Sequence, residues 1–533
     1  MVNSHWKIAA FKGFQAMRSK RFWILAVISF ILLTLPNGFY TTFDKDEPKY
    51  LEAAREMVNS GDYITPYYNY EYRFDKPILI YWIIAAGYKL FGVNEFGGRF
   101  FVSIFGVLTV LLLYLWLIRR KDEDFAFWSS MVLLSLLDFM VMSSVAMPDI
   151  VLSFFITASL IAFYEGYNEK SKKFYLLAFL FSGFATLTKG PVGLVLPGLI
   201  AIIYLILRRD LTKTIKEIPW FSGFLIYSAV VLPWYGAIFY KHGYEFFKEF
   251  IIFHNIHRFL GKVPGHPTEW WYYLANYFWL YLPFSFFFFF AVYRAWKDKE
   301  IFTDNILMFS FCWFFGVFIF FQTAHTKLAH YLLPSFPAFA VIITWYLRKE
   351  KSKIPIILTA LLFLVLLAAG TAFFIYKGWN LLGVVPLILP LIGAIYALKK
   401  DSYLKPITIS FILAMILFKW VTLPTLQPFR AKPVIAKELR EIALKCKNCK
   451  FYFLSYESPE IVYGFRKGQL KSIGFREAEK LLKSNTPVYI VTRENRLNKL
   501  HAPFKVIDKR KELITKHSLV IISNTNGSRK WEK

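Results

Sequence analysis

Residues 22–43, FWILAVISFILLTLPNGFYTTF, form a long apolar run, and residues 44–77, DKDEPKYLEAAREMVNSGDYITPYYNYEYRFDKP, follow it directly as a polar loop. About 20 apolar residues in a helix cross the roughly 30 Å hydrocarbon core of a bilayer. The run is too long for the core of a signal peptide and lacks a small-residue cleavage site, so we interpret it as a retained membrane anchor. The dense ionisable groups of the loop need a chemical explanation, because 56% of the chain is hydrophobic.

The rest of the chain repeats the apolar runs. With 533 residues, 58 phenylalanines and 32 tyrosines and a mean hydropathy of +0.42, it contains more apolar and aromatic material than a water-soluble core needs. We therefore predict a polytopic α-helical membrane protein. Its thirteen predicted spans centre on residues 22–43, 97–118, 124–144, 147–165, 173–188, 191–207, 219–240, 273–296, 304–322, 330–347, 354–376, 380–397 and 404–422.

The distribution of lysine and arginine predicts the orientation of these spans. The N-terminus and every second gap carry cations, for example Arg119 to Lys121 and Lys170 to Lys173, whereas the gaps between them hold few. Because positively charged loops stay in the cytoplasm, we predict a multi-pass protein of the bacterial inner (plasma) membrane with a cytoplasmic N-terminus. Loops 44–96 and 241–272 and the tail from residue 423 then face the periplasm.

The net charge of +28 suggests an anionic partner. Much of the excess lies in short cytoplasmic loops and in the tail, so we expect membrane lipid, and no nucleic acid, as its counterpart. In residues 1–21, Trp6, Phe14 and Met17 fall near one face of a helix that has lysines elsewhere, which is typical of an interfacial helix. A basic flank that only fixes the topology explains this segment equally well.

The tail, residues 423–533, differs in character from the spans. The strand-like runs FYFLSY (451–456) and PVYIVT (487–492) alternate with the helical REAEKLLKS (476–484), which predicts a small periplasmic α/β domain. Cys446 and Cys449 are compatible with a local disulfide, with two free thiols, or with half of a zinc site. The chain contains no phosphate-binding glycine loop of a nucleotide site and no internal repeat.

Separate clusters of ionisable residues fall on one side of the membrane under the predicted topology. Polar groups at membrane depth are costly to place and tend to mark sites. Besides the loop 44–77, the clusters are Asp149, Lys189, FHNIHRF (253–259) and AHTKLAHYLLP (324–334). Because all of these clusters are predicted to lie on the same side of the membrane, they predict one functional site at the periplasmic face.

These clusters, taken in order, resemble a known family. The similarity spans about residues 20 to 465 and rests on DKDEPKYLEAAREM, GDYITP, FDKPILIYW, LFGVNEFGGR, TLTKGPVGL, WWYYL and TKLAHYLLPSFPA. These segments resemble the GT-C-type membrane glycosyltransferases that take a sugar from a polyprenyl-phosphate carrier, namely the aminoarabinose transferases of lipid A and the related protein mannosyltransferases. The resemblance implies a glycosyltransferase whose donor is already activated, so that neither a nucleotide site nor a cofactor is required.

The implied inverting transfer needs a carboxylate that takes the proton of the acceptor, together with cations that hold the phosphate. By resemblance, Asp46 takes the base role in the acidic pair that it forms with Glu47. Asp149 matches an aspartate of the family at the membrane face, where it would contact sugar or acceptor. The alternative for all three is helix capping, because Pro48 and Pro148 suit the first turn of a helix.

Five cations are candidates for binding the donor phosphate. Lys76 matches the phosphate-binding lysine of the family. Lys49 stands where aminoarabinose transferases tend to have arginine, so the charge is kept and the bidentate fork is lost. Lys189, Arg258 and Lys327 complete the set. For Arg258 and Lys327 the alternative is contact of the side chain with lipid headgroups, and for Lys76 it is an ordinary exposed lysine of a loop.

A metal site is a further expectation from the resemblance. Asp75, His254 and Tyr331 occupy positions similar to an outer metal cluster in some aminoarabinose transferases, and their oxygen and nitrogen ligands suit zinc. Alternatively, His254 is only a hydrogen-bonding group at a wet interface.

We predict that loop helices 47–59 and 78–91 cover a cavity that opens to the bilayer and admits the donor lipid sideways. The acceptor stays open between lipid A, another glycolipid and a protein hydroxyl. A transporter or flippase of prenyl-linked sugars would place polar residues near mid-membrane in two related halves. The one-sided clusters and the missing repeat favour the enzyme.

Overall fold

The structure is a computed structural model that describes residues 17–43, 45–258, 260–261, 267–349, 352–400, 402–512 and 517–525. The interfacial segment predicted for residues 1–21 therefore lies largely outside the described residues.

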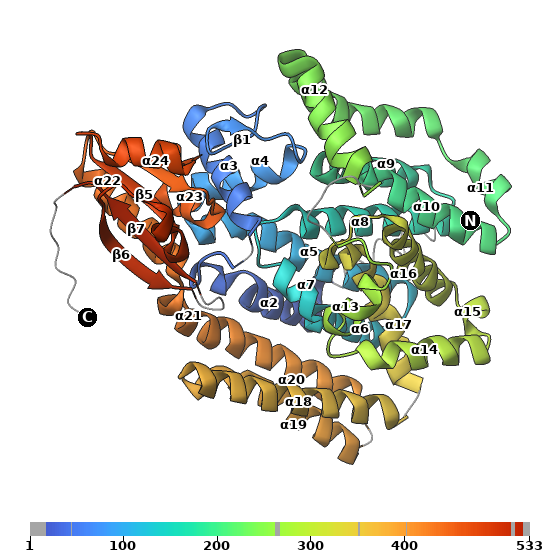
Figure 1. Cartoon of the computed structure of the whole chain (residues 1–533). Helices are drawn as coiled ribbons and strands as arrows, with labels where there is room; N and C mark the ends of the chain where they lie inside the picture. The colour runs from blue at the N-terminus through green and yellow to red at the C-terminus, as the bar shows by residue number, and fades with distance from the viewer. Residues whose placement is uncertain are drawn as a thin grey trace.

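Helices dominate the molecule, and most of the long ones run from side to side in Figure 1. An α/β unit lies at their left-hand ends, next to the loop that follows the first span. The helices of the membrane part are α2 (Lys20–Leu33), α5 (Glu95–Arg120), α6 (Glu123–Ser135), α7 (Leu137–Met142), α8 (Pro148–Glu169), α9 (Lys172–Lys189), α10 (Val192–Leu207), α11 (Leu211–Glu217), α12 (Trp220–Phe246), α13 (Tyr272–Leu280), α14 (Ser285–Lys297), α15 (Glu300–Thr303), α16 (Asn305–Thr323), α17 (Phe336–Lys349), α18 (Ile354–Lys377), α19 (Val385–Lys400), α20 (Leu404–Leu417) and α21 (Leu423–Leu426).

The polytopic membrane fold is confirmed. Within the described residues, nine helical stretches are long and apolar enough to cross a membrane, and α13 with α14, bent by 105°, adds a tenth if the pair is one span. The number thirteen stays a prediction. The run 124–144 is split, because α6 ends at Ser135 and α7 begins at Leu137. The first span is α-helical only to Leu33 and continues as the 3₁₀ turn η1 (Leu35–Gly38), where Pro36 supplies no N–H.

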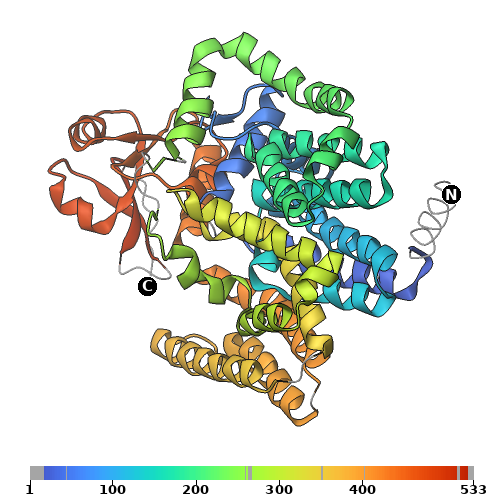
Figure 2. The same ribbon diagram turned by 90° about the vertical axis from the view of Figure 1, so that its right-hand side faces the viewer.

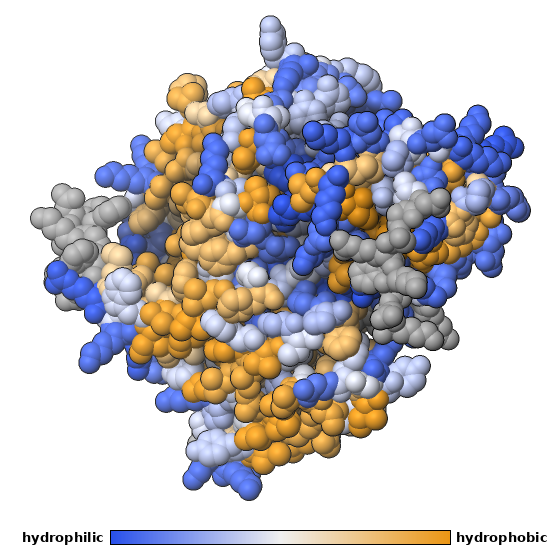
Figure 3. Space-filling model, turned by 90° about the vertical axis from the view of Figure 1, so that its left-hand side faces the viewer, coloured by the Kyte–Doolittle hydropathy of each residue, from blue (hydrophilic) through white to orange (hydrophobic). Residues whose placement is uncertain are grey.

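The helices α18, α19 and α20 form a layer at the bottom of Figure 1 and Figure 2. Many of their large apolar side chains are exposed, among them Leu361, Val365, Ile392 and Leu413. Figure 3 shows hydrophobic side chains gathered over the lower part of the molecule at this height. In a membrane such a surface faces lipid, since no water is present to penalise it.

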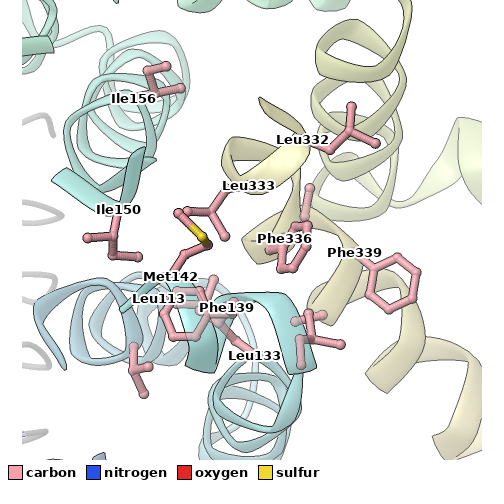
Figure 4. Packing of buried hydrophobic residues seen from close by; sticks show 14 of the residues in the cluster. Leu113, Leu133, Phe139, Met142, Ile150, Ile156, Leu332, Leu333, Phe336 and Phe339 are labelled. Carbon is pink, nitrogen blue, oxygen red and sulfur yellow. The ribbon is translucent and has the colours of Figure 1, made fainter. Parts of the chain in front are cut away.

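The interior of the membrane part fixes the segments that carry the polar residues. Figure 4 shows Leu113, Leu133, Phe139, Ile150 and Leu333 packed together from α5, α6, α7, α8 and the 3₁₀ segment η3 (Ala329–Ser335). Tight packing holds helices together in lipid, where neighbouring tails are as apolar as the side chains. Since Ile150 follows Asp149 and Leu333 lies two residues after Tyr331, this core sets the separation of two walls of the site.

The loop after the first span folds into α3 (Glu47–Ser60), the two-stranded hairpin β1 (Tyr67–Tyr68) and β2 (Glu71–Tyr72), and α4 (Leu79–Phe91). The two helices predicted at 47–59 and 78–91 are thus confirmed. α3 ends at Gly61, whose φ of 74° is the left-handed conformation that glycine adopts without strain.

The tail forms a five-stranded sheet in the order β4-β3-β5-β7-β6, with β3, β4 and β5 parallel and β7 and β6 antiparallel. Both strand-like runs and the helical run of the sequence are found in it. Cys446 and Cys449 form a disulfide, which decides between the three alternatives. The elements are α22 (Ala431–Lys445), β3 (Lys450–Leu454), α23 (Pro459–Phe465), β4 (Lys471–Ile473), α24 (Phe475–Leu482), β5 (Val488–Arg493), β6 (Lys505–Lys511) and β7 (Ser518–Ser523).

The α/β unit contacts the loop of the first span directly, and Figure 2 shows the two side by side. The side chain of Asn69 makes two reciprocal hydrogen bonds with the backbone of Leu470, both of 2.9 Å. Tyr68 donates to Glu457 over 3.2 Å. Asn69 and Tyr70 both have positive φ, 54° and 65°, as the tight turn of a two-residue hairpin requires.

Candidate active site

Asp46 occupies the N-cap position of α3, but its side chain makes no capping hydrogen bond. Oδ1 of Asp46 instead accepts a hydrogen bond of 2.9 Å from the ammonium of Lys49, three residues later. Burial would raise the pKa of Asp46, yet the hydrogen bond and charge of Lys49, with Lys45 and Arg73 nearby, hold that pKa below its usual value. The carboxylate is therefore ionised and half-buried.

Glu47 points to a different place. Its carboxylate accepts two hydrogen bonds, of 2.6 and 2.8 Å, from the guanidinium of Arg99 on α5, and one of 2.9 Å from the backbone N–H of Ala146. Glu47 and Arg99 are both only 1% exposed. The structure thus places Glu47 in an ion pair that ties α3 to α5, outside the cavity that Asp46 lines.

The segment RFDKP (73–77) holds a second ion pair. Arg73 donates to Oδ2 of Asp75 over 2.7 Å, and the hydroxyl of Tyr81 donates to Oδ1 over 3.3 Å. Burial would raise the pKa of Asp75, but Arg73 and Lys76 outweigh burial and lower it to about 2. Lys76 donates to the backbone carbonyl of Asp75 over 2.8 Å. Burial, reinforced by nearby cations, lowers the pKa of Lys76 to about 7.

A third ion pair joins two helix ends of the membrane part. The ammonium of Lys189, at the last residue of α9, lies 2.5 Å from Oδ1 of Asp149 in the first turn of α8. Nε2 of His330 lies 3.8 Å from Oδ2 of Asp149. The ring of Tyr331 lies under the ammonium of Lys189, 4.0 Å from its centroid, at a distance that favours a cation–π contact.

These groups meet in one polar cavity of about 330 Å³. Nine of the eleven residues predicted from the sequence line it: Asp46, Lys49, Asp75, Lys76, Asp149, Lys189, His254, Arg258 and Tyr331. His254 and Arg258 reach it from the π-helical segment η2 (Phe247–His257) and the residue after it. Four other polar lining residues were not predicted from the sequence, namely Lys45, Tyr50, Arg73 and His330.

The four missed residues lie next to predicted ones in the sequence. Lys45 precedes Asp46, Arg73 lies two residues before Asp75, and His330 precedes Tyr331. All four lie inside clusters that the sequence indicated, the loop 44–77 and the segment 324–334, but no motif marked them individually. Whether the side chain of a neighbouring residue points into the cavity depends on the local backbone. Asp46, for example, lines the cavity, whereas Glu47 pairs with Arg99 outside it.

A second cavity of about 410 Å³ adjoins the first and shares Asp75, Lys76, Lys189, His254, Arg258 and Tyr331 with it. Its remaining lining is largely apolar and comes from η2, from the start of α10 and from the end of α16: Pro191, Val192, Val195, Phe250, Ile256, Leu260, Phe320, Phe321, Ala324 and Thr326. The cations at the shared wall therefore stand between a polar chamber and an apolar one.

Lys327 is the other predicted residue that the structure does not bring into either cavity. Its ammonium donates to the backbone carbonyl of Ala324 over 2.7 Å, and its side chain is buried. Burial lowers the pKa of Lys327, against a smaller opposing effect of Glu269. Lys327 thus fixes the turn that precedes η3.

Asp75, His254 and Tyr331 line the same cavities, but the surroundings of Asp75 do not resemble a metal site. Its carboxylate already accepts hydrogen bonds from Arg73 and Tyr81, and Arg258 and Lys76 add positive charge nearby. In the part of the chain that the structure describes, no group of three or more His, Cys, Asp or Glu residues could hold a metal ion.

Comparisons with known proteins support one family. The sequence model of the dolichyl-phosphate-mannose-protein mannosyltransferases matches residues 19–246. An uncharacterized protein of Aquifex aeolicus (strain VF5) is 33% identical over 426 residues, which cover 79% of this chain and 82% of that protein. The undecaprenyl phosphate-alpha-4-amino-4-deoxy-L-arabinose arabinosyl transferase of Aeromonas hydrophila subsp. hydrophila is 28% identical over 404 residues, covering 68% of this chain and 72% of that enzyme.

A solved structure agrees with the fold. The crystal structure of ArnT from Cupriavidus metallidurans bound to undecaprenyl phosphate matches with a TM-score of 0.80 at 20% identity, over 96% of this chain and 100% of that chain. At this identity the likeness shows that the two chains share a polytopic membrane fold.

Proposed function

The chain belongs to the family of membrane glycosyltransferases that take their sugar from a polyprenyl phosphate, and we propose that it transfers an aminoarabinose-type or hexose-type sugar from that carrier to lipid A or a related envelope acceptor. The observation that carries the proposal is the pair of adjoining cavities with cations at their shared wall. A polyprenyl phosphate sugar has the same order of parts: an apolar chain, a phosphate and a polar sugar.

The phosphate is proposed to bind at the shared wall. Lys76, Arg258 and Lys189 line both cavities, so they can hold the phosphate while the prenyl chain lies against Phe250, Phe320 and neighbouring apolar residues. During transfer the bond from the anomeric carbon to the phosphate oxygen breaks, and the phosphate leaves with additional negative charge. Fixed cations lower the barrier by stabilising that charge as it develops.

Asp46 is proposed as the general base. Asp46 lines the polar cavity but not the apolar one. It therefore lies on the side where an acceptor would approach. As the acceptor oxygen bonds to the anomeric carbon, its proton passes to the carboxylate of Asp46. Lys49, 2.9 Å away, keeps that carboxylate ionised and ready to accept the proton.

Asp149 and Glu47 are proposed to act differently from Asp46. Asp149, with His330 beside it, faces the polar cavity, where it would contact the sugar or the acceptor. Glu47 is proposed to be structural, because its pairing with Arg99 ties the start of α3 to α5. Lys327 is proposed to be structural for the same kind of reason.

The cation distribution supports a proposed orientation in the inner membrane, with the N-terminus in the cytoplasm and both cavities on the periplasmic side. We propose residues 22–422 as the catalytic membrane part and residues 423–533 as an outer domain, after the basic segment 1–21. The cavities lie at the ends of α8 and α9 that carry Asp149 and Lys189. The cations Arg119 and Arg120 are in the last turn of α5, where they pair with Glu165 and Glu169 near the other end of α8.

The test is transfer by the purified full-length protein in lipid nanodiscs, with a synthetic polyprenyl-phosphate sugar and lipid A, read by mass spectrometry of both products. We expect the wild type to consume the donor and Asp46→Asn to be inactive at equal expression. Glu71→Gln is the matched control, because it makes the same chemical change at an exposed carboxylate of the same loop. No donor consumption by the wild type with any acceptor would contradict the proposal.

A protein hydroxyl is a second candidate acceptor, which the family model over residues 19–246 favours. Mass spectrometry of lipid A and of envelope proteins, with and without the gene, separates the two. Loss of a sugar mass from lipid A supports the first acceptor, and loss from serine or threonine peptides supports the second.

A divalent metal at Asp75, His254 and Tyr331 is retained only as a subsidiary proposal. The three residues share both cavities, but the Arg73 and Tyr81 hydrogen bonds to Asp75 fit a metal poorly, so no step is assigned to one. Elemental analysis of the purified wild type and His254→Ala settles it: stoichiometric zinc lost in the variant would support the metal, and equal content would remove it.

A further inference from the structure

A third cavity lies away from the catalytic chambers, between the outer end of the first span and the α/β unit. Its volume is about 150 Å³. Three cations line it, Lys437 and Arg440 from α22 and Arg466 from the end of α23, together with Thr41 and Thr42. The proposed transfer reaction uses none of these residues.

The position of the cavity along the spans places it at the level of lipid headgroups. Thr41 and Thr42 follow the first span, which ends at Gly38, and Glu95 in the lining is the first residue of α5. The end of the first span and the start of α5 lie on the same side of the membrane as the catalytic cavities, since Asp46 follows Thr42 by four residues. Phosphates of the lipids in that leaflet lie just beyond the ends of the spans.

The cations are available for a ligand. Lys437 and Arg440 are exposed and lie three residues apart on one face of α22. No ion pair joins either to a carboxylate within the described residues. Arg466 is pre-positioned, because its Nε donates to the carbonyl of Tyr463 over 3.0 Å and its Nη1 to that of Val93 over 2.6 Å.

Two carboxylates also line the cavity, and they leave the positive charge in excess. Glu460 is buried and already paired with both Arg430 and Lys432. Glu95 is then the single carboxylate opposite Lys437, Arg440 and Arg466. It can accept a hydrogen bond from a hydroxyl of the same headgroup.

The floor of the cavity is rigid. A Cβ on Gly464 would come within 2.5 Å of the Cβ of Ala436, so the missing side chain lets α23 approach α22 closely. Both helices also pack in the core of the α/β unit, through Ile435, Leu439 and Ile461. The spacing of the cations is therefore set by the fold and not by the ligand.

We propose that this cavity binds the phosphate of a lipid headgroup at the outer ends of α2 and α5, and so anchors the α/β unit to the bilayer surface. The chain supplies charge complementarity for it: from residue 423 onward it contains 24 lysines and arginines and ten aspartates and glutamates. Phosphate is the ligand that guanidinium and ammonium groups at fixed spacing bind best. The same chemistry would accept a free phosphate monoester, which the experiment separates.

The test compares the full-length wild type with Lys437→Gln/Arg440→Gln. The control is Arg476→Gln/Lys480→Gln, which removes the same charge from exposed positions of α24 in the same unit. Native mass spectrometry from mixed phosphatidylglycerol and phosphatidylcholine nanodiscs counts retained lipids. Calorimetric titration with inorganic phosphate in detergent tests the free anion.

We expect the wild type and the control to retain one more phosphatidylglycerol molecule than the Lys437/Arg440 variant. The affinity of that variant for phosphatidylglycerol should be at least about tenfold lower, because two charge-assisted hydrogen bonds are lost. If the wild type and the control bind inorganic phosphate and only this variant does not, the site is supported, with a soluble phosphate as its ligand in place of a lipid. Equal lipid retention by all three proteins, without phosphate binding, would overturn the proposal, and so would equal losses in the variant and the control. Arg466→Lys, which keeps the charge and loses the fork, provides a second reading if the double variant folds poorly.

Discussion

The ammonium of Lys189 lies 2.5 Å from Oδ1 of Asp149, although the two residues end and begin different helices and are 40 positions apart in the chain. Asp149 is 3% exposed, so its charge is balanced chiefly by this partner. Three such pairs, Lys49–Asp46, Arg73–Asp75 and Lys189–Asp149, line the polar cavity. Six lysine and arginine side chains line the cavity against three carboxylates, so its charge favours an anionic ligand.

Breaking the Lys189–Asp149 pair should cost stability. Removing one partner of a buried pair leaves an uncompensated charge, at a cost of about 3–5 kcal/mol. We expect Asp149→Asn and Lys189→Met each to lower the unfolding temperature of the detergent-solubilised protein by several degrees, and the double variant Asp149→Asn/Lys189→Met to recover part of the loss. Transfer should stay impaired in all three. If the double variant fell by the sum of the single losses, the two residues would not be coupled.

Asp46 and Glu47 should separate catalysis from folding. General-base catalysis typically contributes about 10²- to 10⁴-fold, so Asp46→Asn should lose at least about a hundredfold in kcat with an unchanged unfolding temperature. Glu47→Gln leaves the buried guanidinium of Arg99 without its charge partner, so it should destabilise the protein and retain activity per folded molecule. Thermal unfolding and single-turnover transfer, measured on the same samples, check both. The reverse pattern would exchange the two roles.

The pKa of Lys76, lowered to about 7 by burial, predicts a pH dependence of donor binding. Below that pKa the ammonium is charged and binds phosphate, and above it the charge is lost. The KM for the donor should therefore rise, by up to about tenfold per pH unit, between about pH 7 and about pH 9. Lys76→Arg keeps its charge over this range and should flatten the profile.

Unfolding cannot mimic this effect. Because the folded-state pKa of Lys76 lies below the unfolded value, the unfolded chain binds more protons between about pH 7 and about pH 10, and this group makes the protein more stable as the pH rises. Loss of affinity accompanied by unchanged or rising stability would support Lys76 as the titrating group. A pH profile that Lys76→Arg does not alter would exclude it.

Asn69 should couple the α/β unit to the active site, because the hairpin that it turns leads directly to Arg73, Asp75 and Lys76. Asn69→Gly removes both hydrogen bonds to Leu470 and keeps the left-handed turn, whereas Asn69→Ala also adds backbone strain of about 1 kcal/mol. We expect kcat to fall severalfold in Asn69→Gly and further in Asn69→Ala. Hydrogen exchange of residues 67–76 should rise in the same order. Unchanged exchange in both variants would show that the contact does not hold the hairpin.

Much of the fold and of the site could be predicted from the sequence, because both depend on local patterns. The apolar runs indicate a polytopic membrane protein, and Pro48 after Asp46 indicates the start of α3. The motif FDKP and the polar ends of the spans supplied nine residues that line the cavity. The number of spans could not be fixed in this way, since a break such as that between α6 and α7 follows from packing and leaves no clear mark in hydropathy.

What the sequence determined by itself is the kind of protein and the set of polar groups at one face of the membrane, because hydropathy, charge distribution and motif order are properties of the chain alone. Only the tertiary structure decided how those groups pair. Asp46 and Glu47 are neighbours, yet one side chain enters the cavity beside Lys49 and the other pairs with Arg99 on α5. The direction of a side chain follows from the helix that carries it and from the partners that distant segments bring within hydrogen-bond distance. The sequence alone specifies neither of these directly.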